Sequence, residues 1–314
     1  MAQSKTFKHF LELPSEVRTV LFDEMNAGDR CRMTRCSKLC NREAKESRKY
    51  IKGLALIADN DYDLQFLVIY EMGLEKPTGY RLDFKTDTET EKKCIKYFEL
   101  ELGEVSTEEL WKTDLEDATD MLELMNQHFT EKLHAFHDKI ETLALCSVQP
   151  PIAFHLDVES LKNLTYLEVH APCDVPQILS LTRKNLEHLC VAEEVDLAEC
   201  EKIYQVSQHF YSKHTKLNVE QMKRLCAEDV HIHIGELTEQ NIHDFIKSWQ
   251  DGSIGRKLHE YLWLLIGSKF DFQVFRGLFK DATDEGQSLL IKNKNGESAE
   301  VSFFTACYLK FTVI

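Results

Sequence analysis

Three small groups of residues have types and spacings that could support metal or acid–base chemistry. His231 and His233 alternate with apolar residues in segment 230–234, so both imidazoles fall on one face of a strand, where they could hold a metal ion or a proton. Cys36 and Cys40 could share a helix face, but no second pair at zinc-ligand spacing follows nearby. The acidic segment 59–63 opens like a calcium loop but lacks the glycine and glutamate needed at positions six and twelve. A solvent-facing strand edge is the preferred interpretation of the histidines, packing that of the cysteines and an acidic turn that of segment 59–63, so no metal site is predicted.

Sequence motifs for catalysis are also missing. The chain has no phosphate-binding loop, no G-x-G-x-x-G after a strand, no G-x-S-x-G and no H-E-x-x-H. A nucleophilic Cys/His pair stays open, since nothing distinguishes one of the ten cysteines from the others. We therefore expect a protein that is not an enzyme and uses no cofactor, and its binding surfaces become the candidate sites.

Composition limits the class of protein. The 314 residues allow two or three domains, and 43% hydrophobic and 29% charged residues are ordinary for a globular chain. No apolar run approaches the ~20 residues of a membrane span, and the first ten residues lack the apolar core of a signal peptide. The sequence predicts an intracellular protein, cytoplasmic or nuclear, without a membrane partner.

Charge is distributed unevenly along the chain. Residues 1–52 contain 12 basic and 7 acidic side chains, a balance of +5, whereas the whole chain carries −15 and the remainder therefore −20. A basic head on an acidic body argues against a protein that binds nucleic acid as a whole. The charge change also marks residues 1–52 as a separate unit.

The basic head contains a segment, residues 9–25, that is unusually apolar for its length. Pro14 suits a first helical position, so we expect a helix that begins there. Its apolar residues cover roughly 200° of the circumference, although one core-facing stripe needs little more than ~100°. The excess predicts a helix that is buried on two sides, one against its own domain and the other against a partner. A helix enclosed within a larger core is the alternative.

Short helices and then strands are expected after this segment. Two further helices, beginning near Asp29 and Ser37, would complete a three-helix domain over residues 8–52, which is too small to bury a full core alone. In the second domain, residues 53–314, segments 64–72, 79–87 and 92–102 predict strands, and 106–140 predicts one helix that starts at Ser106 or Thr107. A hairpin that turns at Asn295–Gly296 is expected near the end.

A weak repeat organises the middle of the second domain. Segments 140–145, 164–169 and 186–191 each fit L-x-x-L-x-L, at a spacing within the range of leucine-rich repeats. A strand at 230–234, a helix at 237–252 and a strand at 258–266 form a β-α-β unit, whose two strands should be parallel. The predicted fold is therefore α+β, with a small three-helix head followed by a leucine-rich-repeat-like α/β domain with a largely parallel sheet.

Two parts of the chain together resemble a known family. The segment LELPSEVRTVLFDEMNAGDRCRMTRCSKLC resembles an F-box, the short helical motif that opens with Leu-Pro. Residues 227–252 and the following strand resemble the F-box-associated domain of the nematode-expanded F-box family, including its Trp-x-x-Gly at Trp249 to Gly252. The residues at the signature positions of the F-box are Leu13, Pro14, Val17, Val20, Leu21, Cys36, Ser37 and Leu39.

The resemblance implies a substrate-recognition adaptor of an SCF-type cullin–RING ubiquitin ligase. The F-box would dock on a Skp-type adaptor through its signature residues, and the second domain would hold a target protein, with the chemistry left to other subunits. By analogy with repeat proteins, the surface between residues 140 and 270 is where a target is expected. The alternative is a non-catalytic scaffold whose F-box-like head does not engage a ligase. A hydrolase with an unrecognised Cys/His pair is the third class.

Overall fold

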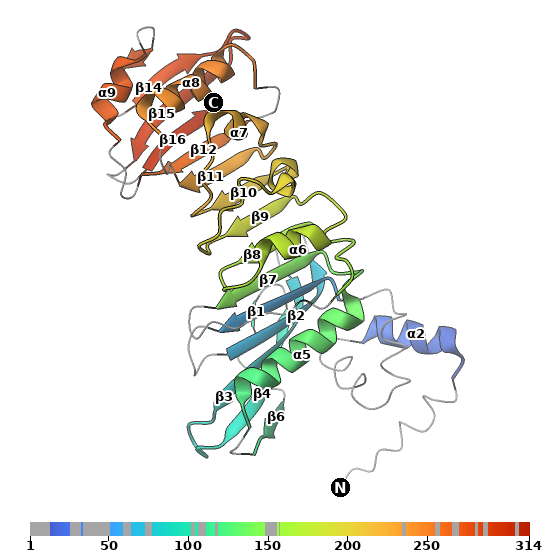
Figure 1. Cartoon of the computed structure of the whole chain (residues 1–314). Helices are drawn as coiled ribbons and strands as arrows, with labels where there is room; N and C mark the ends of the chain where they lie inside the picture. Colours follow the sequence, from blue (N-terminus) through green and yellow to red (C-terminus); the bar gives the residue numbers. More distant parts are fainter. Residues whose placement is uncertain are drawn as a thin grey trace. The chain divides into compact units, whose positions relative to one another are not determined.

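The structure is a computed structural model that describes residues 13–25, 33, 51–58, 64–72, 77–101, 104–105, 111–116, 119–147, 156, 158–233, 237–254, 258–265, 270–279, 282–284, 288–304 and 308–314. The chain divides into two compact units, residues 1–164 and residues 165–314 (Figure 1). The predicted domain boundary at residue 52 stays a prediction, because most of the residues just before it lie outside the described part.

The first described element is helix α2 (Ser15–Glu24). The carbonyl of Pro14 accepts the hydrogen bond from the Arg18 amide at 3.1 Å, so Pro14 caps the helix rather than occupying its first turn. The helix ends at Glu24, within the apolar segment 9–25. Of the three helices expected in the head, the structure describes this one; the segments assigned to the other two lie almost wholly outside the described residues.

Unit 1 is built on a sheet whose strands are mostly joined by short connections. Strands β1 (Gly53–Ala58), β2 (Leu64–Met72), β3 (Pro77–Thr86) and β4 (Lys93–Glu101) pair antiparallel in sequence order. The short strands β5 (Glu104–Val105) and β6 (Trp111–Asp114) pair with β4, and β7 (Thr142–Ser147) pairs parallel with β1. The strands predicted at 64–72, 79–87 and 92–102 are confirmed.

One helix, α5 (Met121–Phe136), packs on this sheet with Met125, Phe129 and Leu133 buried (Figure 1). The prediction of a helix over 106–140 is wrong for its first part, where residues 111–114 form β6 instead. Asp120 is the actual N-cap, because its carboxylate accepts hydrogen bonds from the amides of Leu122 and Glu123. Residues 111–114 therefore form a strand, despite their helical periodicity, because they pair with the edge of β4.

Unit 2 contains five parallel strands that lie side by side in sequence order (Figure 1). They are β8 (Tyr166–Val169), β9 (His188–Val191), β10 (His209–Ser212), β11 (Asp229–His233) and β12 (Glu260–Leu264). The three L-x-x-L-x-L segments correspond to β7, β8 and β9, and β11 is parallel to β12 as predicted. No strand is expected at residues 209–212 from the sequence, so β10 extends the row of strands beyond the prediction.

Short helical segments return the chain between these strands. They are α6 (Val175–Leu181), the 3-10 helix η1 (Glu201–Gln205), α7 (Val219–Arg224) and α8 (Glu239–Gln250). Helix α8 agrees with its prediction, since Thr238 forms a capping box and Ile242, Phe245, Ile246 and Trp249 are buried. The Phe245 ring lies 4.7 Å from that of Tyr261, which fixes α8 against β12.

The C-terminal part of unit 2 is antiparallel. Helix α9 (Phe272–Gly277) precedes β13 (Thr283–Asp284), β14 (Ser288–Lys292), β15 (Ser298–Phe304) and β16 (Tyr308–Val313), and β16 also pairs antiparallel with β12. The hairpin predicted at Asn295–Gly296 is confirmed between β14 and β15, where Gly296 has a φ of 86°. The fold is α+β as expected, but its strand pairing is mixed rather than largely parallel, because the strands at both ends of the second domain are joined by short hairpin connections that only antiparallel partners permit.

Candidate functional site

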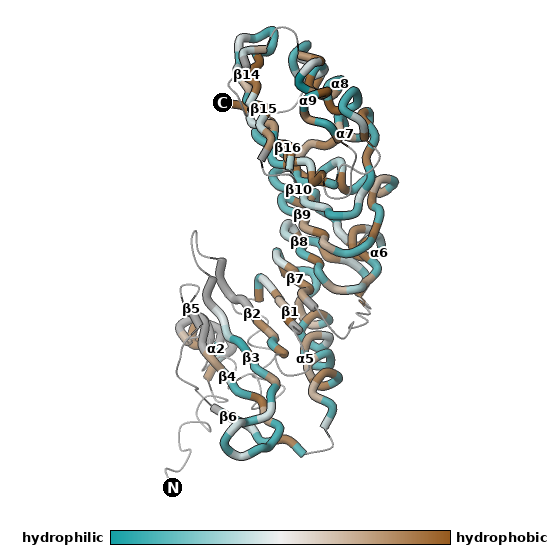
Figure 2. The backbone as a smooth tube through the Cα atoms, turned by 90° about the vertical axis from the view of Figure 1, so that its left-hand side faces the viewer, coloured by the Kyte–Doolittle hydropathy of each residue, from teal (hydrophilic) through white to brown (hydrophobic). Residues whose placement is uncertain are grey.

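The parallel strands of unit 2 bury one face and leave the other accessible. Apolar side chains such as Leu167, Leu189, Phe210 and Val230 form the buried row, and Figure 2 shows α6, α7 and α8 together on one side of the strands. The alternate residues point to the opposite side, where they are partly exposed. We call this second surface the open face; its residues are Tyr166, Glu168, His188, Cys190, His209, Tyr211, Asp229, His231, His233, Glu260 and Leu262.

The middle of the open face is a row of aromatic and histidine rings. The ring centres of Tyr166 and His188 are 5.5 Å apart, those of His188 and His209 6.3 Å, and those of His209 and His231 5.1 Å. Each ring comes from the next strand, so the strand spacing of the sheet sets these distances. The row gives the open face a continuous surface of planar groups that can both stack and form hydrogen bonds.

The central histidine of the row is kept neutral by its surroundings. Burial lowers the pKa of His209 below its ordinary value, and the neighbouring imidazoles of His231 and His188 lower it further. Asp229 and Glu260 oppose this shift more weakly. At neutral pH His209 is therefore a hydrogen-bonding group without charge.

At one end of the open face, carboxylates lie close to histidine and lysine side chains. The Glu260 carboxylate lies 3.3 Å from Nε2 of His231 and 2.6 Å from Nζ of Lys310, and Asp229 lies 2.7 Å from Nδ1 of His259. His231 and His233 share a face, as the alternating sequence predicts, but His231 faces a carboxylate rather than a metal-ligand set. Within the described part of the chain these two histidines belong to no group of three close metal-type ligands.

Glu168, His170 and Cys190 bring three different donor atoms together at the other end. Nε2 of His170 is 3.0 Å from Oε1 of Glu168 and 3.7 Å from Sγ of Cys190. The hydroxyl of Tyr166 donates a hydrogen bond of 2.9 Å to the other oxygen of Glu168. A nucleophilic Cys/His pair with an orienting acid needs the sulfur and the acid at opposite nitrogens of the ring. Here both face the same nitrogen, so the trio does not have that geometry.

The signature residues in the head form a second candidate surface. In α2 the side chains of Val17, Val20 and Leu21 are 43%, 58% and 39% exposed, whereas Arg18 is buried and donates a hydrogen bond to the Leu13 carbonyl. Pro14 is exposed and Leu13 is half-buried. The other three predicted residues, Cys36, Ser37 and Leu39, lie outside the described residues. Of the predicted partner-binding residues, the structure thus brings Val17, Val20 and Leu21 together on one side of α2.

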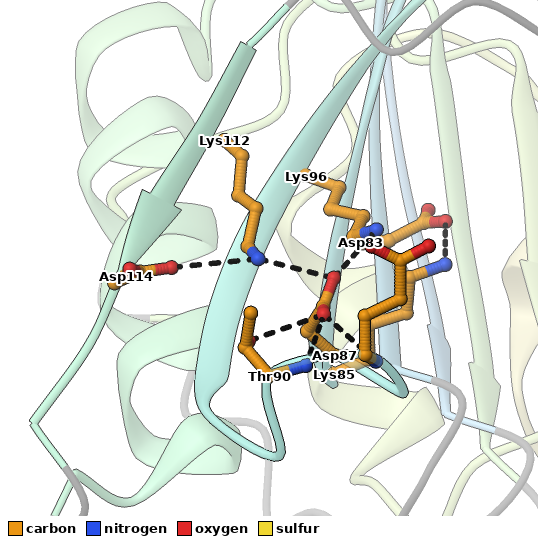
Figure 3. Close-up of polar contacts among 8 residues, drawn as sticks. Asp83, Lys85, Asp87, Thr90, Lys96, Lys112 and Asp114 are labelled. Carbon is orange, nitrogen blue, oxygen red and sulfur yellow. Dashed lines mark hydrogen bonds and ion pairs between the residues drawn. The ribbon is translucent and has the colours of Figure 1, made fainter.

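A dense cluster of charged side chains lies at the turn between β3 and β4 in unit 1. Asp87, next to β3, accepts hydrogen bonds from the Thr90 hydroxyl and amide, and its carboxylate lies 2.9 Å from Nζ of Lys96 and 3.1 Å from Nζ of Lys112 (Figure 3). These partners hold the pKa of the Asp87 carboxyl well below its usual range, with Lys96 the largest cause. The Asp87 carboxylate is paired with the two lysines. The cluster therefore fixes the turn from β3 to β4 and anchors β6 through Lys112.

Two thiols and a hollow beside β14, elsewhere in the described part, are weaker candidates for a reactive site. Burial raises the pKa of Cys173 to about 12 and also raises the pKa of Cys94, which keeps both thiols protonated and poorly nucleophilic. A hollow of about 890 Å³ lies beside β14 and is lined by Gln250, Leu290, Ile314 and neighbouring residues; Lys292 is its only charged lining side chain among those described. Neither feature forms a reactive constellation.

Most of the open face was not predicted from the sequence. His231 and His233 were candidate residues, but Glu168, His170, Cys190 and His209 were not. A signal was present, because Tyr166 and His188 occupy one variable position of the L-x-x-L-x-L repeat, and Glu168 and Cys190 occupy the next. Variable positions of a repeat point to the accessible side of its strands, where repeat proteins bind their ligands.

Among the described residues, no helix combines the length and the apolar character needed to cross a membrane.

Comparisons with known proteins do not identify a function for the open face. No family model, no curated protein and no solved structure matches the chain.

Proposed function

We propose that this chain is a substrate-recognition adaptor of an SCF-type cullin–RING ubiquitin ligase, with its head docked on a Skp-type adaptor and a target protein held by unit 2. The observation that carries the proposal is the exposed apolar surface of Val17, Val20 and Leu21 on α2. This surface lies within the segment that resembles an F-box, at three of the signature positions.

The exposure of these residues favours a partner over internal packing. Val17, Val20 and Leu21 are spaced i, i+3 and i+4, so they form one stripe on α2. Fully burying one such side chain is worth about 1.5–3 kcal/mol, and an apolar stripe left in water forgoes much of that gain. A docked protein that covered the stripe would recover it, and hot spots of protein interfaces are built from clustered anchors of this kind.

The open face supports the second half of the proposal. It presents aromatic, histidine and acidic side chains on a row of parallel strands, which suits recognition of a polar protein surface. Glu168 contacts the same nitrogen of His170 as Cys190 does, so the trio lacks an orienting acid at the opposite nitrogen, and this face is better suited to binding than to catalysis. Ubiquitin transfer would then belong to other subunits of the ligase.

The test is co-expression of the full chain with a Skp-type adaptor, followed by size-exclusion chromatography. We expect a stable binary complex with the natural sequence, and its loss in the double variant Val20→Asp and Leu21→Asp. Val274→Asp is the matched control, because Val274 of α9 is also a helical valine, 55% exposed, and lies outside the head. Complex formation by the double variant, or no complex with the natural chain, would contradict the proposal and leave the scaffold alternative.

A further inference from the structure

We propose that Glu168, His170 and Cys190 form a binding site for a zinc ion, with the fourth coordination position open to water or to a side chain of a bound protein. The site is independent of the proposed ligase function, since it rests on the donor atoms alone. We call it the β8–β9 site.

The strands β8 and β9 place the three side chains by simple register. Glu168 is paired with Cys190 across the two strands, so both side chains project from the open face at the same level. His170 follows β8 two residues after Glu168 and therefore continues along the same face. Two adjacent strands and the first residue after β8 thus supply all three ligands, without any contribution from a distant loop.

The donor set fits zinc better than other divalent ions common in cells. A thiolate, an imidazole and a carboxylate are the three side-chain ligands that Zn²⁺ takes. Calcium and magnesium select oxygen ligands, so a site with sulfur and nitrogen discriminates against both. Three protein ligands with one open position is a recurrent arrangement of accessible zinc sites.

The distances are close to those that a tetrahedral ion requires. Zn–S bonds of about 2.3 Å and Zn–N bonds of about 2.0 Å at tetrahedral angles place sulfur and nitrogen about 3.5 Å apart, and nitrogen and oxygen about 3.3 Å apart. The structure has 3.7 Å from Cys190 Sγ to His170 Nε2 and 3.0 Å from that nitrogen to Glu168 Oε1. The three donor atoms all lie within 4.8 Å of one another, which is close to the spacing of ligands around one ion.

A simple ion pair explains the arrangement less completely. If Nε2 of His170 carries a proton, the proton is directed mainly at Glu168, and the Cys190 sulfur is a weak acceptor for it. If Nε2 is unprotonated, the Cys190 thiol can donate to it, but the lone pair also faces the Glu168 carboxylate, which is unfavourable. A cation between the donors satisfies all three at once. The Tyr166 hydroxyl, bonded to the second oxygen of Glu168 at 2.9 Å, would orient that ligand as outer partners of metal sites do.

Metal titration of the full chain tests the site. Reduced protein, freed of metal by a chelator, is titrated with ZnCl₂ by calorimetry and with CoCl₂ by absorption spectroscopy. We expect a zinc-binding event of one ion per chain at the β8–β9 site and a cobalt–thiolate charge-transfer band. Cys190→Ser and His170→Gln should each weaken this event about tenfold or more and remove the band. Cys226→Ser and His214→Gln, which change a cysteine and a histidine outside the trio, should leave both unchanged.

A second measurement does not depend on how well a variant folds. Zinc should slow alkylation of Cys190 in the natural chain, as followed by mass spectrometry of its peptide, and should not slow that of the exposed Cys226. Equal labelling of Cys190 with and without zinc, or unchanged zinc affinity in folded Cys190→Ser and His170→Gln variants, overturns the proposal. So does failure of the natural chain to take up zinc at micromolar concentration.

Discussion

His209 occupies the centre of the ring row on the open face, and its neutral state has a consequence for stability. Burial and the two neighbouring histidines, His188 and His231, lower its pKa in the folded chain, whereas the unfolded chain titrates near the ordinary value of ~6.5. As pH falls below that value, the unfolded state binds a proton that the folded state resists. Folding stability should therefore fall with pH in this range, and the effect should vanish above it.

Replacing His209 with glutamine should reduce that loss, because glutamine cannot take up the proton. We expect urea unfolding at pH 7.5 and at pH 5.5 to show a smaller decrease in the free energy of unfolding for His209→Gln than for the natural chain. His214→Gln, which lies in the loop after β10 and outside the row, is the control and should behave like the natural chain. Identical pH dependence in the natural chain and His209→Gln would contradict the assignment.

Asp87 is a second residue whose ionisation is tied to the fold. Its carboxyl pKa is held well below the usual range by Lys96, Thr90 and Lys112, so the ion pairs contribute fully above pH ~4 and are lost as pH falls below it. Asp87→Asn should lower the melting temperature at pH 7 and reduce the loss of stability between pH 4 and pH 2, as followed by circular dichroism. Asp114→Asn is the control, since Asp114 is more than half exposed and 3.6 Å from Lys112. An equal effect of the two substitutions would count against the cluster as the anchor of β6.

At the scale of elements, helix α8 shows how local sequence fixes both ends of a segment. Thr238 caps its start, and its end has the two hydrogen bonds of a Schellman turn, from Gly252 N to the Trp249 carbonyl at 3.0 Å and from Ser253 N to the Ser248 carbonyl at 2.8 Å. Gly252 has a φ of 67°, which L-residues with a Cβ adopt at a cost. The Trp-x-x-Gly motif is thus a buried anchor followed by a helix stop.

Gly252→Ala should therefore destabilise unit 2 by about 1–2 kcal/mol, the cost of a left-handed conformation with a Cβ. The new Cβ would also displace the end of the Lys294 side chain, which is flexible enough to move. Gly277→Ala is the matched control, because Gly277 ends α9 in open space and without a positive φ; we expect no loss or a small gain. Chemical denaturation of both variants measures their free energies of unfolding. Equal values would contradict the explanation that the left-handed turn requires glycine at position 252.

The same elements show what sequence can and cannot predict. Helix α8 and the final hairpin carry their caps, turn residues and periodicity locally, so their prediction succeeded. The helix expected over 106–140 failed in its first part because β4 offers residues 111–114 a strand edge that no local pattern records. The β8–β9 site was not predicted for a related reason. Glu168 and Cys190 are 22 positions apart in the sequence and are brought together only by the register of β8 and β9.

For the whole molecule, the proposed adaptor needs two surfaces that act separately. The exposed stripe of α2 belongs to unit 1 and the open face belongs to unit 2. Substitutions that remove one surface without unfolding the chain should then leave the partners of the other in place. An enzyme or a single-surface scaffold would not divide its partners in this way.

Quantitative affinity capture of tagged full-length chains from native cells tests that division. Val20→Asp with Leu21→Asp should lose Skp-type and cullin subunits but retain the remaining partners, because the open face is intact. Tyr211→Ala with Leu262→Ala removes contact area from the open face and should produce the opposite pattern, with ligase subunits kept and other partners reduced about tenfold or more. Val274→Asp serves as the surface control and should keep both groups. If the two double variants lose the same partners, the chain uses one shared interface, and the two-surface proposal is wrong.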